Sequence, residues 1–201
     1  MRRPEGPLQQ PPARRLALLG GESSGKTTLA QALAEQLHTA WVPEYGRQLW
    51  EELRHTLSVD ELLHVARRQV ELEDAAAAQR SGWIVCDTTP LTTLQYCLHD
   101  HGQAPPELHA LARRRYDLTV VCEPDFDFVQ DGCRRDDVFR QAQHAWALAQ
   151  LQAQDVPYLC ARGNIAARVA QVLACLHQMP VLHSRLHSPT PPPAPTLPSP
   201  P

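Results

Sequence analysis

The stretch L-A-L-L-G-G-E-S-S-G-K-T, residues 16–27, joins a short apolar run to a glycine-rich turn and then to a helix-forming segment. Four apolar residues that stop at glycine are typical of a buried parallel strand. In the pattern G-x-x-x-x-G-K-[ST] of residues 20–27, glycines let backbone N–H groups turn inward around phosphate groups. The positive end of the helix that follows adds to this attraction. The stretch therefore predicts an α/β P-loop NTP-binding fold.

The phosphate loop provides the expected ATP-binding residues. They are Gly20, Gly21, Glu22, Ser23, Ser24, Gly25, Lys26, Thr27 and Thr28. Lys26 is expected to reach the outer phosphates, and the Thr27 hydroxyl to coordinate Mg²⁺. The chain has 18 arginines and a single lysine, Lys26, which indicates that a compact ammonium is needed at this place. A chance glycine-rich turn is the alternative interpretation.

Strand-like and helix-like segments alternate along the rest of the chain. Apolar runs at 40–42, 83–86, 118–122 and 158–160 predict four more strands. Helical spacing predicts helices over 27–37, over 59–80, up to about Gln154, and from Ile165 to Leu176, the last capped by Asn164. This order predicts a three-layer α/β/α domain with a five-stranded parallel sheet, over residues 15–178. Residues 1–14 (Pro/Arg-rich) and 179–201 (Pro-rich) are expected to be disordered.

Asp87 follows the third predicted strand directly. A carboxylate at the carboxyl end of a buried strand lies beside the phosphate loop in this architecture, where it can hold Mg²⁺. The alternative is that Asp87 caps a helix that begins near Thr88, since Pro90 suits a first turn.

Glu44 and Arg47 follow the second predicted strand. A carboxylate at this position faces the transferable phosphate from across the cleft, so Glu44 could orient or deprotonate an acceptor hydroxyl. Arg47 could hold phosphate oxygens or the substrate. The alternative is a capping glutamate beside a solvated arginine.

The segment 125–140 follows the fourth strand and mixes arginines with aspartates around a glycine. Such a segment suits a lid that closes over ATP and neutralises charge during phosphoryl transfer. The expected lid residues are Asp131, Arg134, Arg135 and Arg140, with Arg134 as a catalytic residue. An exposed charged loop is the alternative.

Composition excludes several classes of protein. The net charge of −3 gives no basic face of the size that nucleic-acid binding needs. No apolar run approaches the roughly 18 residues of a membrane span, and no secretory signal precedes the domain, so a soluble cytoplasmic protein is expected. A GTP switch is disfavoured because its N-K-x-D motif needs a second lysine.

Four motifs together resemble the ribosylnicotinamide kinase domain of the NadR family: G-G-E-S-S-G-K-T at 20–27, E-Y-G-R at 44–47, C-D-T at 86–88 and D-G-C-R at 131–134. The resemblance covers about residues 15–178. It implies a nucleoside- or nucleotide-kinase-like fold with ATP and Mg²⁺ as cofactors. The implied reaction is phosphorylation of nicotinamide riboside to its mononucleotide, a step of NAD salvage. No H-x-G-H signature is present, so the family's adenylyl-transfer activity is not expected.

The chain departs from the family at the ring pocket. A tryptophan stands directly before E-Y-G-R in the family, whereas Pro43 holds that position here and Trp41 lies two residues earlier. Trp41 and Tyr45 are the nearest aromatic candidates for contact with a cationic pyridinium, beside Glu44. Two alternatives remain open: a kinase for another nucleoside or nucleotide, and an ATP-switched binding protein.

Overall fold

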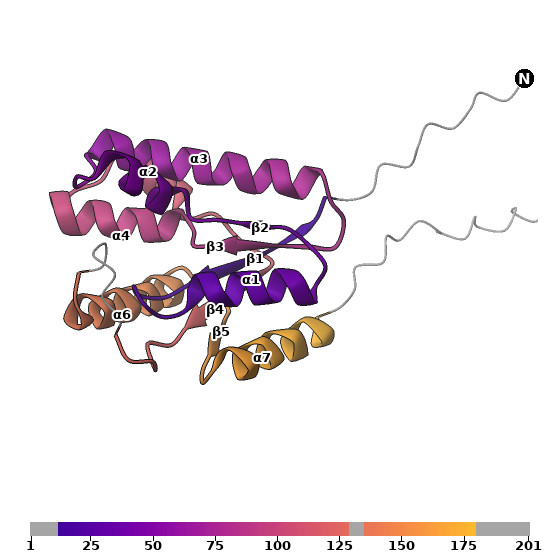
Figure 1. Cartoon of the computed structure of the whole chain (residues 1–201). Helices are drawn as coiled ribbons and strands as arrows, with labels where there is room; N and C mark the ends of the chain where they lie inside the picture. The colour runs from indigo at the N-terminus through magenta and orange to yellow at the C-terminus, as the bar shows by residue number, and fades with distance from the viewer. Residues whose placement is uncertain (1–11, 129–134, 180–201) are drawn as a thin grey trace, which may run out of the picture.

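A parallel five-stranded sheet forms the centre of the computed structural model, which describes residues 12–128 and 135–179 (Figure 1). Its strands are β1 (Arg14–Leu19), β2 (Trp41–Val42), β3 (Trp83–Asp87), β4 (Leu118–Cys122) and β5 (Tyr158–Ala161). They lie side by side in the order β2-β3-β1-β4-β5. The predicted fold class is confirmed, and the predicted strands differ from the observed ones by at most two residues at either end.

Seven helices cover the two faces of the sheet in the described part of the chain. They are α1 (Lys26–Gln36), α2 (Tyr45–Leu53), α3 (Val59–Ala78), α4 (Pro90–His101), α5 (Pro106–Leu111), α6 (Asp137–Ala153) and α7 (Ile165–Gln178). Apolar residues of α1 and α7 pack with Leu16, Leu18 and Val120 on one face. Residues of α3 to α6 pack with Leu19 and Val121 on the other face. The alternation of side chains along β1 and β4 thus serves two separate cores.

Side-chain caps fix where two of the predicted helices begin. Ser58 and Glu61 form a capping box at the start of α3, in which each side chain bonds the other's backbone N–H. The Asn164 side chain accepts a hydrogen bond from the Ala167 N–H at 2.9 Å, as predicted for the start of α7.

The edge of the sheet at the carboxyl ends of its strands carries the site. β1 lies between β3 and β4, and its neighbours are reached by crossovers on opposite sides, which opens a crevice at this edge. The register pairs Leu18 with Asp87, and the Thr88 N–H donates to the Leu18 carbonyl at 3.1 Å. The end of β3 therefore lies directly beside the turn that leaves β1.

The folded domain begins slightly earlier than the sequence predicts. Ala13 is buried, and its N–H donates to the Ala77 carbonyl at 3.0 Å. The Arg14 N–H donates to the Gly82 carbonyl at 2.8 Å. These two residues belong to the sheet and its margin and not to a leader, whereas residues 1–11 and the tail from 180 lie outside the described residues. Within the part that the structure describes, no helix has the length and apolar character to cross a membrane.

Candidate active site

The phosphate loop between β1 and α1 has the backbone shape that an anion site needs. Gly20 has φ +140°, and a Cβ there would lie 2.6 Å from the Cys122 carbonyl oxygen, so only glycine fits. Gly25 is the left-handed N-cap of α1 and offers no side-chain cap, and the first turn of α1 has no acidic residue. The first N–H groups of α1 are therefore left for a ligand, at the positive end of the helix.

Lys26 lies inside this loop. Its ammonium donates to the carbonyls of Gly20 at 3.0 Å and Gly21 at 2.8 Å. The side chain is partly buried and lines a cavity in front of the loop. These carbonyl contacts hold the chain's single ammonium at the phosphate position.

Thr27 and Asp87 form a hydrogen-bonded pair beside the loop. The Thr27 hydroxyl donates to Asp87 Oδ2 at 2.7 Å. Asp87 is 1 % exposed, and its other oxygen, Oδ1, is buried without a hydrogen-bond partner in the described structure. Burial raises the pKa of Asp87, against the hydrogen bond from Thr27 and the charge of Lys26, which lower it. Thr89 caps α4 instead, accepting from the Leu91 N–H at 3.2 Å, so the capping interpretation of Asp87 is wrong.

A cavity of about 720 Å³ opens in front of the loop. It is walled by the loop, α2, the first half of α3, one face of α4 and one residue of α6. Its lining beyond the loop comprises Glu44, Gly46, Arg47, Trp50, Thr56, Leu57, Leu62, Val65, Gln69, Thr88, Thr92, Thr93, Tyr96, Asp100, Arg135 and Gln143. Threonines, carboxylates, two aromatic rings and a few aliphatic side chains suit a polar molecule with one ring.

Glu44 faces the phosphate loop across this cavity. It is the N-cap residue of α2 but makes no side-chain capping bond, which removes the capping interpretation. Desolvation raises the pKa of its carboxyl to about 7, while the nearby charge of Lys26 lowers it and that of Asp87 raises it. A carboxyl with this pKa can take up a proton near neutral pH. Arg47, one turn into α2, lines the same cavity and pairs with Glu51 at 3.2 Å.

The two aromatic residues expected at the ring pocket are elsewhere. Trp41 packs against the core on the α1 and α7 face, and Tyr45 packs on the other core with its ring edge toward His64. Neither is among the described residues that line the cavity. Trp50, one turn beyond Arg47 on the same face of α2, and Tyr96 of α4 line it instead.

Tyr96 also belongs to a hydrogen-bond network that the sequence did not reveal. Its hydroxyl donates to Glu22 Oε1 at 2.7 Å, and the Arg135 N–H donates to Glu22 Oε2 at 2.7 Å. The Glu22 N–H donates to Gln143 at 2.8 Å. Burial keeps the pKa of Tyr96 well above its usual value, so the phenol stays a donor. Glu22 thus ties the phosphate loop to α4 and to the start of α6.

Arg168 is a second residue that sequence reasoning missed. It lies on α7, is fully buried, and its guanidinium donates to the carbonyls of Gly163, Ser24 and Glu123 at 2.7–2.8 Å. It also binds the Asp125 carboxylate. The arginine therefore links the phosphate loop to the segments that follow β4 and β5.

The structure describes two of the four predicted lid residues. Asp131 and Arg134 lie outside the described residues. Arg135 lines the cavity and pairs with Asp100. Arg140 is 4 % exposed, donates to the Phe126 carbonyl at 2.8 Å, and has its own backbone against Gly21. Arg140 thus supports the loop from the side and is not among the cavity residues.

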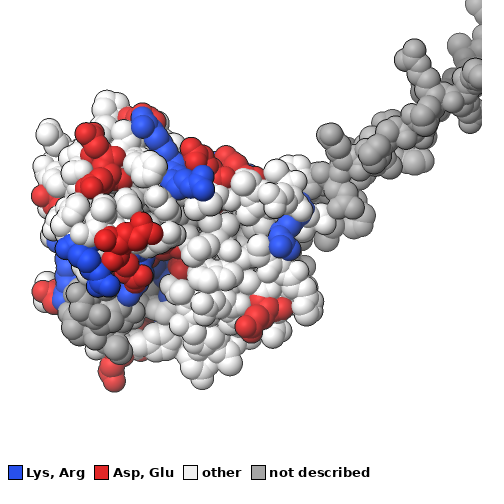
Figure 2. Space-filling model, turned by 45° about the horizontal axis from the view of Figure 1, so that its top comes forward, with Lys and Arg blue, Asp and Glu red and all other residues white. Residues whose placement is uncertain are grey.

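Charged groups gather at the end of the molecule that carries the loop. Figure 2 shows acidic and basic side chains intermixed there, while much of the rest of that face is uncharged. No single sign of charge dominates the view.

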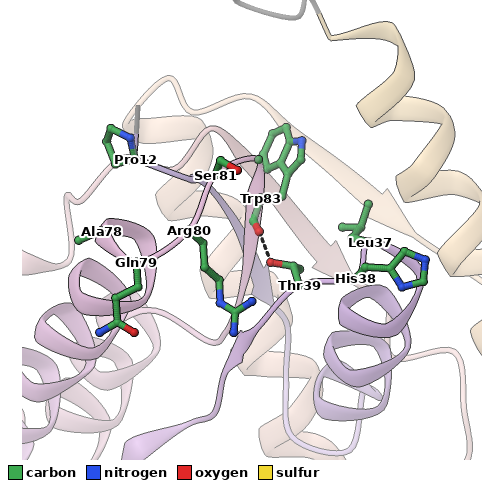
Figure 3. Close-up of a pocket in the computed structure, with 10 residues that line it drawn as sticks. Pro12, Leu37, His38, Thr39, Ala78, Gln79, Arg80, Ser81 and Trp83 are labelled. Carbon is green, nitrogen blue, oxygen red and sulfur yellow. Dashed lines mark hydrogen bonds between the residues drawn. The ribbon is translucent and has the colours of Figure 1, made fainter. Parts of the chain in front are cut away.

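A second groove of about 850 Å³ lies at the opposite end of the sheet. Figure 3 shows Arg80, Gln79, Thr39 and His38 around it, with Trp83 at its rim. The carboxyl-terminal ends of α1 and α3 lie at this groove, and their carbonyls carry partial negative charge that disfavours phosphate. The phosphate chemistry therefore belongs to the cavity at Lys26.

Comparison with known proteins agrees with this geometry. Residues 15–168 match a protein-family model described as an AAA domain. The chain belongs to that AAA-domain family. It is also 32% identical over 126 residues to the trifunctional NAD biosynthesis/regulator protein NadR of Salmonella typhimurium, and equally to that of Escherichia coli. This alignment covers 60% of the chain and 31% of NadR, so the chain matches about a third of the length of these relatives.

Solved structures show the same fold for this AAA-domain chain. A NadR protein in complex with NR superposes with a TM-score of 0.67 at 20% identity, over 82% of the chain and 50% of the other. Thymidylate kinase from Ehrlichia chaffeensis gives 0.57 at 18% identity, over 83% and 100%. A deoxyadenosine kinase from M. mycoides gives 0.56 at 10% identity, over 82% and 100%. The AAA-domain chain therefore has the P-loop fold of NadR and of nucleoside and nucleotide kinases.

Proposed function

We propose that residues 15–178 form a kinase domain that transfers the γ-phosphoryl group of ATP to the 5′-hydroxyl of a nucleoside. Nicotinamide riboside is the first candidate, as a step of NAD salvage in the cytoplasm. The observation that carries this proposal is Glu44, a carboxyl with pKa about 7 in a cavity that it shares with Lys26 and the phosphate loop. A switch protein that only binds ATP has no need of a base poised in this way.

The residues have distinct roles in the proposed transfer. The acceptor oxygen attacks the γ-phosphorus, the bond to the β–γ bridging oxygen breaks, and ADP leaves with that electron pair. Glu44 takes the proton of the hydroxyl as the new bond forms. Lys26 and the N–H groups at the start of α1 stabilise the negative charge that the transferring group spreads over its oxygens.

Thr27 and Asp87 fit the Mg²⁺ that such a transfer uses. The buried, unpaired Asp87 Oδ1 and the adjacent Thr27 hydroxyl are the hard oxygen ligands that this ion prefers. Among the described residues no cluster of three His, Cys, Asp or Glu could hold a metal, so ATP and water would complete the coordination. Bound Mg²⁺ would supply neutralising charge at the phosphates and would favour ionised Asp87.

Two features support a nucleoside, and nicotinamide riboside among nucleosides. The relatives named NadR are 32% identical to the chain over 126 residues, and a solved NadR structure holds NR. Trp50 and Tyr96 line the same cavity as the carboxylates of Glu44 and Asp100, and aromatic rings together with carboxylates suit a cationic ring. Another nucleoside or a nucleotide is the second candidate, because thymidylate and deoxyadenosine kinases share the fold.

The test is turnover of purified protein with excess Mg-ATP and nicotinamide riboside, uridine, cytidine, adenosine or thymidine. For the preferred acceptor, kcat/KM should rise about tenfold from pH 6 to pH 8, because a carboxyl of pKa about 7 passes from mostly protonated to mostly ionised. Glu44→Gln should lose this dependence and at least about a hundredfold in rate, with ATP binding unchanged.

Two outcomes would each contradict a part of this proposal. If another nucleoside is used at least as efficiently, nicotinamide riboside is not the substrate. Steady ATP hydrolysis that no acceptor accelerates would point to a nucleotide-switched binding protein instead.

A further inference from the structure

Arg135 is held at the wall of the cavity by Asp100. Its guanidinium donates to Asp100 Oδ1 at 2.5 Å and lies 4.5 Å above the ring of Phe139. Its own N–H donates to Glu22, so the residue is anchored beside the phosphate loop. The Asp100 side chain is 12% exposed and the Arg135 side chain 35%. Both line the cavity.

This pairing determines what an incoming phosphate would meet. Besides Lys26 of the loop, the cations that line the described cavity are Arg47 and Arg135, and each faces a carboxylate, Glu51 and Asp100 respectively. Glu22 and Glu44 add two further acidic groups. A neutral or cationic acceptor tolerates this arrangement. An acceptor that carries a 5′-phosphate would have to compete with Asp100 for Arg135 and would be repelled by the carboxylates that line the cavity.

The fold itself does not settle whether the acceptor carries a phosphate. A deoxyadenosine kinase and a thymidylate kinase both superpose on this chain over more than four fifths of its length. The difference must therefore come from side chains that line the cavity. Asp100 is suited to it, because it removes the effect of a guanidinium that already lies near the phosphate loop.

The geometry points to Asp100 as a specificity-determining residue, which neutralises Arg135 and so disfavours ligands with a 5′-phosphate. This inference rests on the proposed nucleoside kinase activity and states how that activity is kept to nucleosides. It also has a consequence for the product, which is itself a 5′-monophosphate. Because Arg135 is occupied, the product is held weakly and leaves.

The experiment compares binding of nucleosides and their monophosphates to wild type and Asp100→Asn. Calorimetry without ATP gives Kd for nicotinamide riboside, thymidine and the 5′-monophosphate of each. In the variant, Kd of the monophosphates should fall about tenfold or more, because the residue at 100 no longer carries a negative charge that competes for Arg135 and repels the phosphate. Kd of the nucleosides should change by less than about threefold.

Two further variants make the result specific. Asp100→Asn combined with Arg135→Gln should lose the gain, because the guanidinium that carries it is gone. Glu107→Gln is the matched control: it frees Arg67 from an ion pair of 2.5 Å on the surface, away from the cavity, and should leave all Kd values unchanged.

An unchanged ratio of monophosphate to nucleoside affinity in Asp100→Asn, with wild-type melting and ATP binding, overturns the inference. So does a gain that survives in the double variant. If Asp100→Asn does not fold, Asp100→Ser removes the same charge and is held to the same result. A wild type that phosphorylates no nucleoside refutes the proposed function, whereas the binding ratio still decides the role of Asp100.

Discussion

Glu44→Gln should make the ligand-free protein more stable at high pH, a result that does not depend on which acceptor is used. Desolvation raises the pKa of Glu44 from 4.5 to about 7. The folded state thus holds this proton more tightly than the unfolded state. The stabilisation is complete below about pH 4.5 and is lost as the pH rises through about 7. Gln, which has no proton to lose, does not show this loss.

The magnitude follows from the size of the pKa shift. A shift of about 2.5 units at about 1.4 kcal/mol each gives an upper limit of roughly 3.5 kcal/mol. Water in the open cavity screens the charge and lowers this figure, so a difference of about 1 to 3 kcal/mol is expected.

The assay is urea unfolding of wild type and variant at about pH 5 and about pH 8, without nucleotide. The two proteins should be nearly equal at the lower pH, and the variant should be the more stable at the higher. Glu52→Gln, on the exposed side of the same helix, controls for the loss of any carboxylate from α2. If the difference in free energy of unfolding between wild type and Glu44→Gln is the same at both pH values, the claim that Glu44 is desolvated is refuted.

Three further predictions concern the phosphate side of the site. Lys26→Ala and Lys26→Arg should each lose ATP turnover by orders of magnitude while the melting temperature stays close to wild type, because a planar guanidinium cannot replace a compact ammonium; near-normal turnover of Lys26→Arg would contradict this. Asp87→Asn should shift the Mg²⁺ dependence of activity to higher metal concentration, and an unchanged metal curve would remove Asp87 from the metal site. Arg168→Met should lower the free energy of unfolding by about 3 to 5 kcal/mol in urea, because it leaves Asp125 and three carbonyls without their donor; a loss under about 1 kcal/mol would show that these contacts are not structural.

The sequence predicted the elements whose signals are local. The run before Gly20, the four later apolar runs and the cap at Asn164 are set by neighbours in the chain, and they recur in the structure. The order of the strands is not a local property. It became visible only from the pairing of Leu18 with Asp87 and of β1 with β4.

The phosphate half of the site was predictable for the same reason, and the acceptor half was not. One continuous segment builds the loop, whereas the cavity wall collects single residues from α2, α3, α4 and α6. Trp50 was within reach of prediction, because it lies three residues beyond Arg47 on a helical face. Trp41 was preferred for its nearness in sequence, but alternation along β2 turns its side chain to the other core.

Arg168 escaped prediction because a buried arginine on an apolar helix looks like a solvated one until its partners are known. Its partners come from three separate loops, at Ser24, Glu123 and Gly163. Nothing in the local sequence distinguishes this residue from Arg162, which lies just before α7 and is largely exposed.

The single lysine at the phosphate loop also allows nucleotide binding to be followed by chemical labelling. Apart from the N-terminal amine, an amine-selective reagent has only one group to modify, and that group is Lys26. Its bonds to Gly20 and Gly21 place it in the cavity, where a bound triphosphate would shield it. The share of intact chains whose mass shows a second acyl group, beyond the one on the N-terminal amine, should therefore fall as more of the protein carries nucleotide.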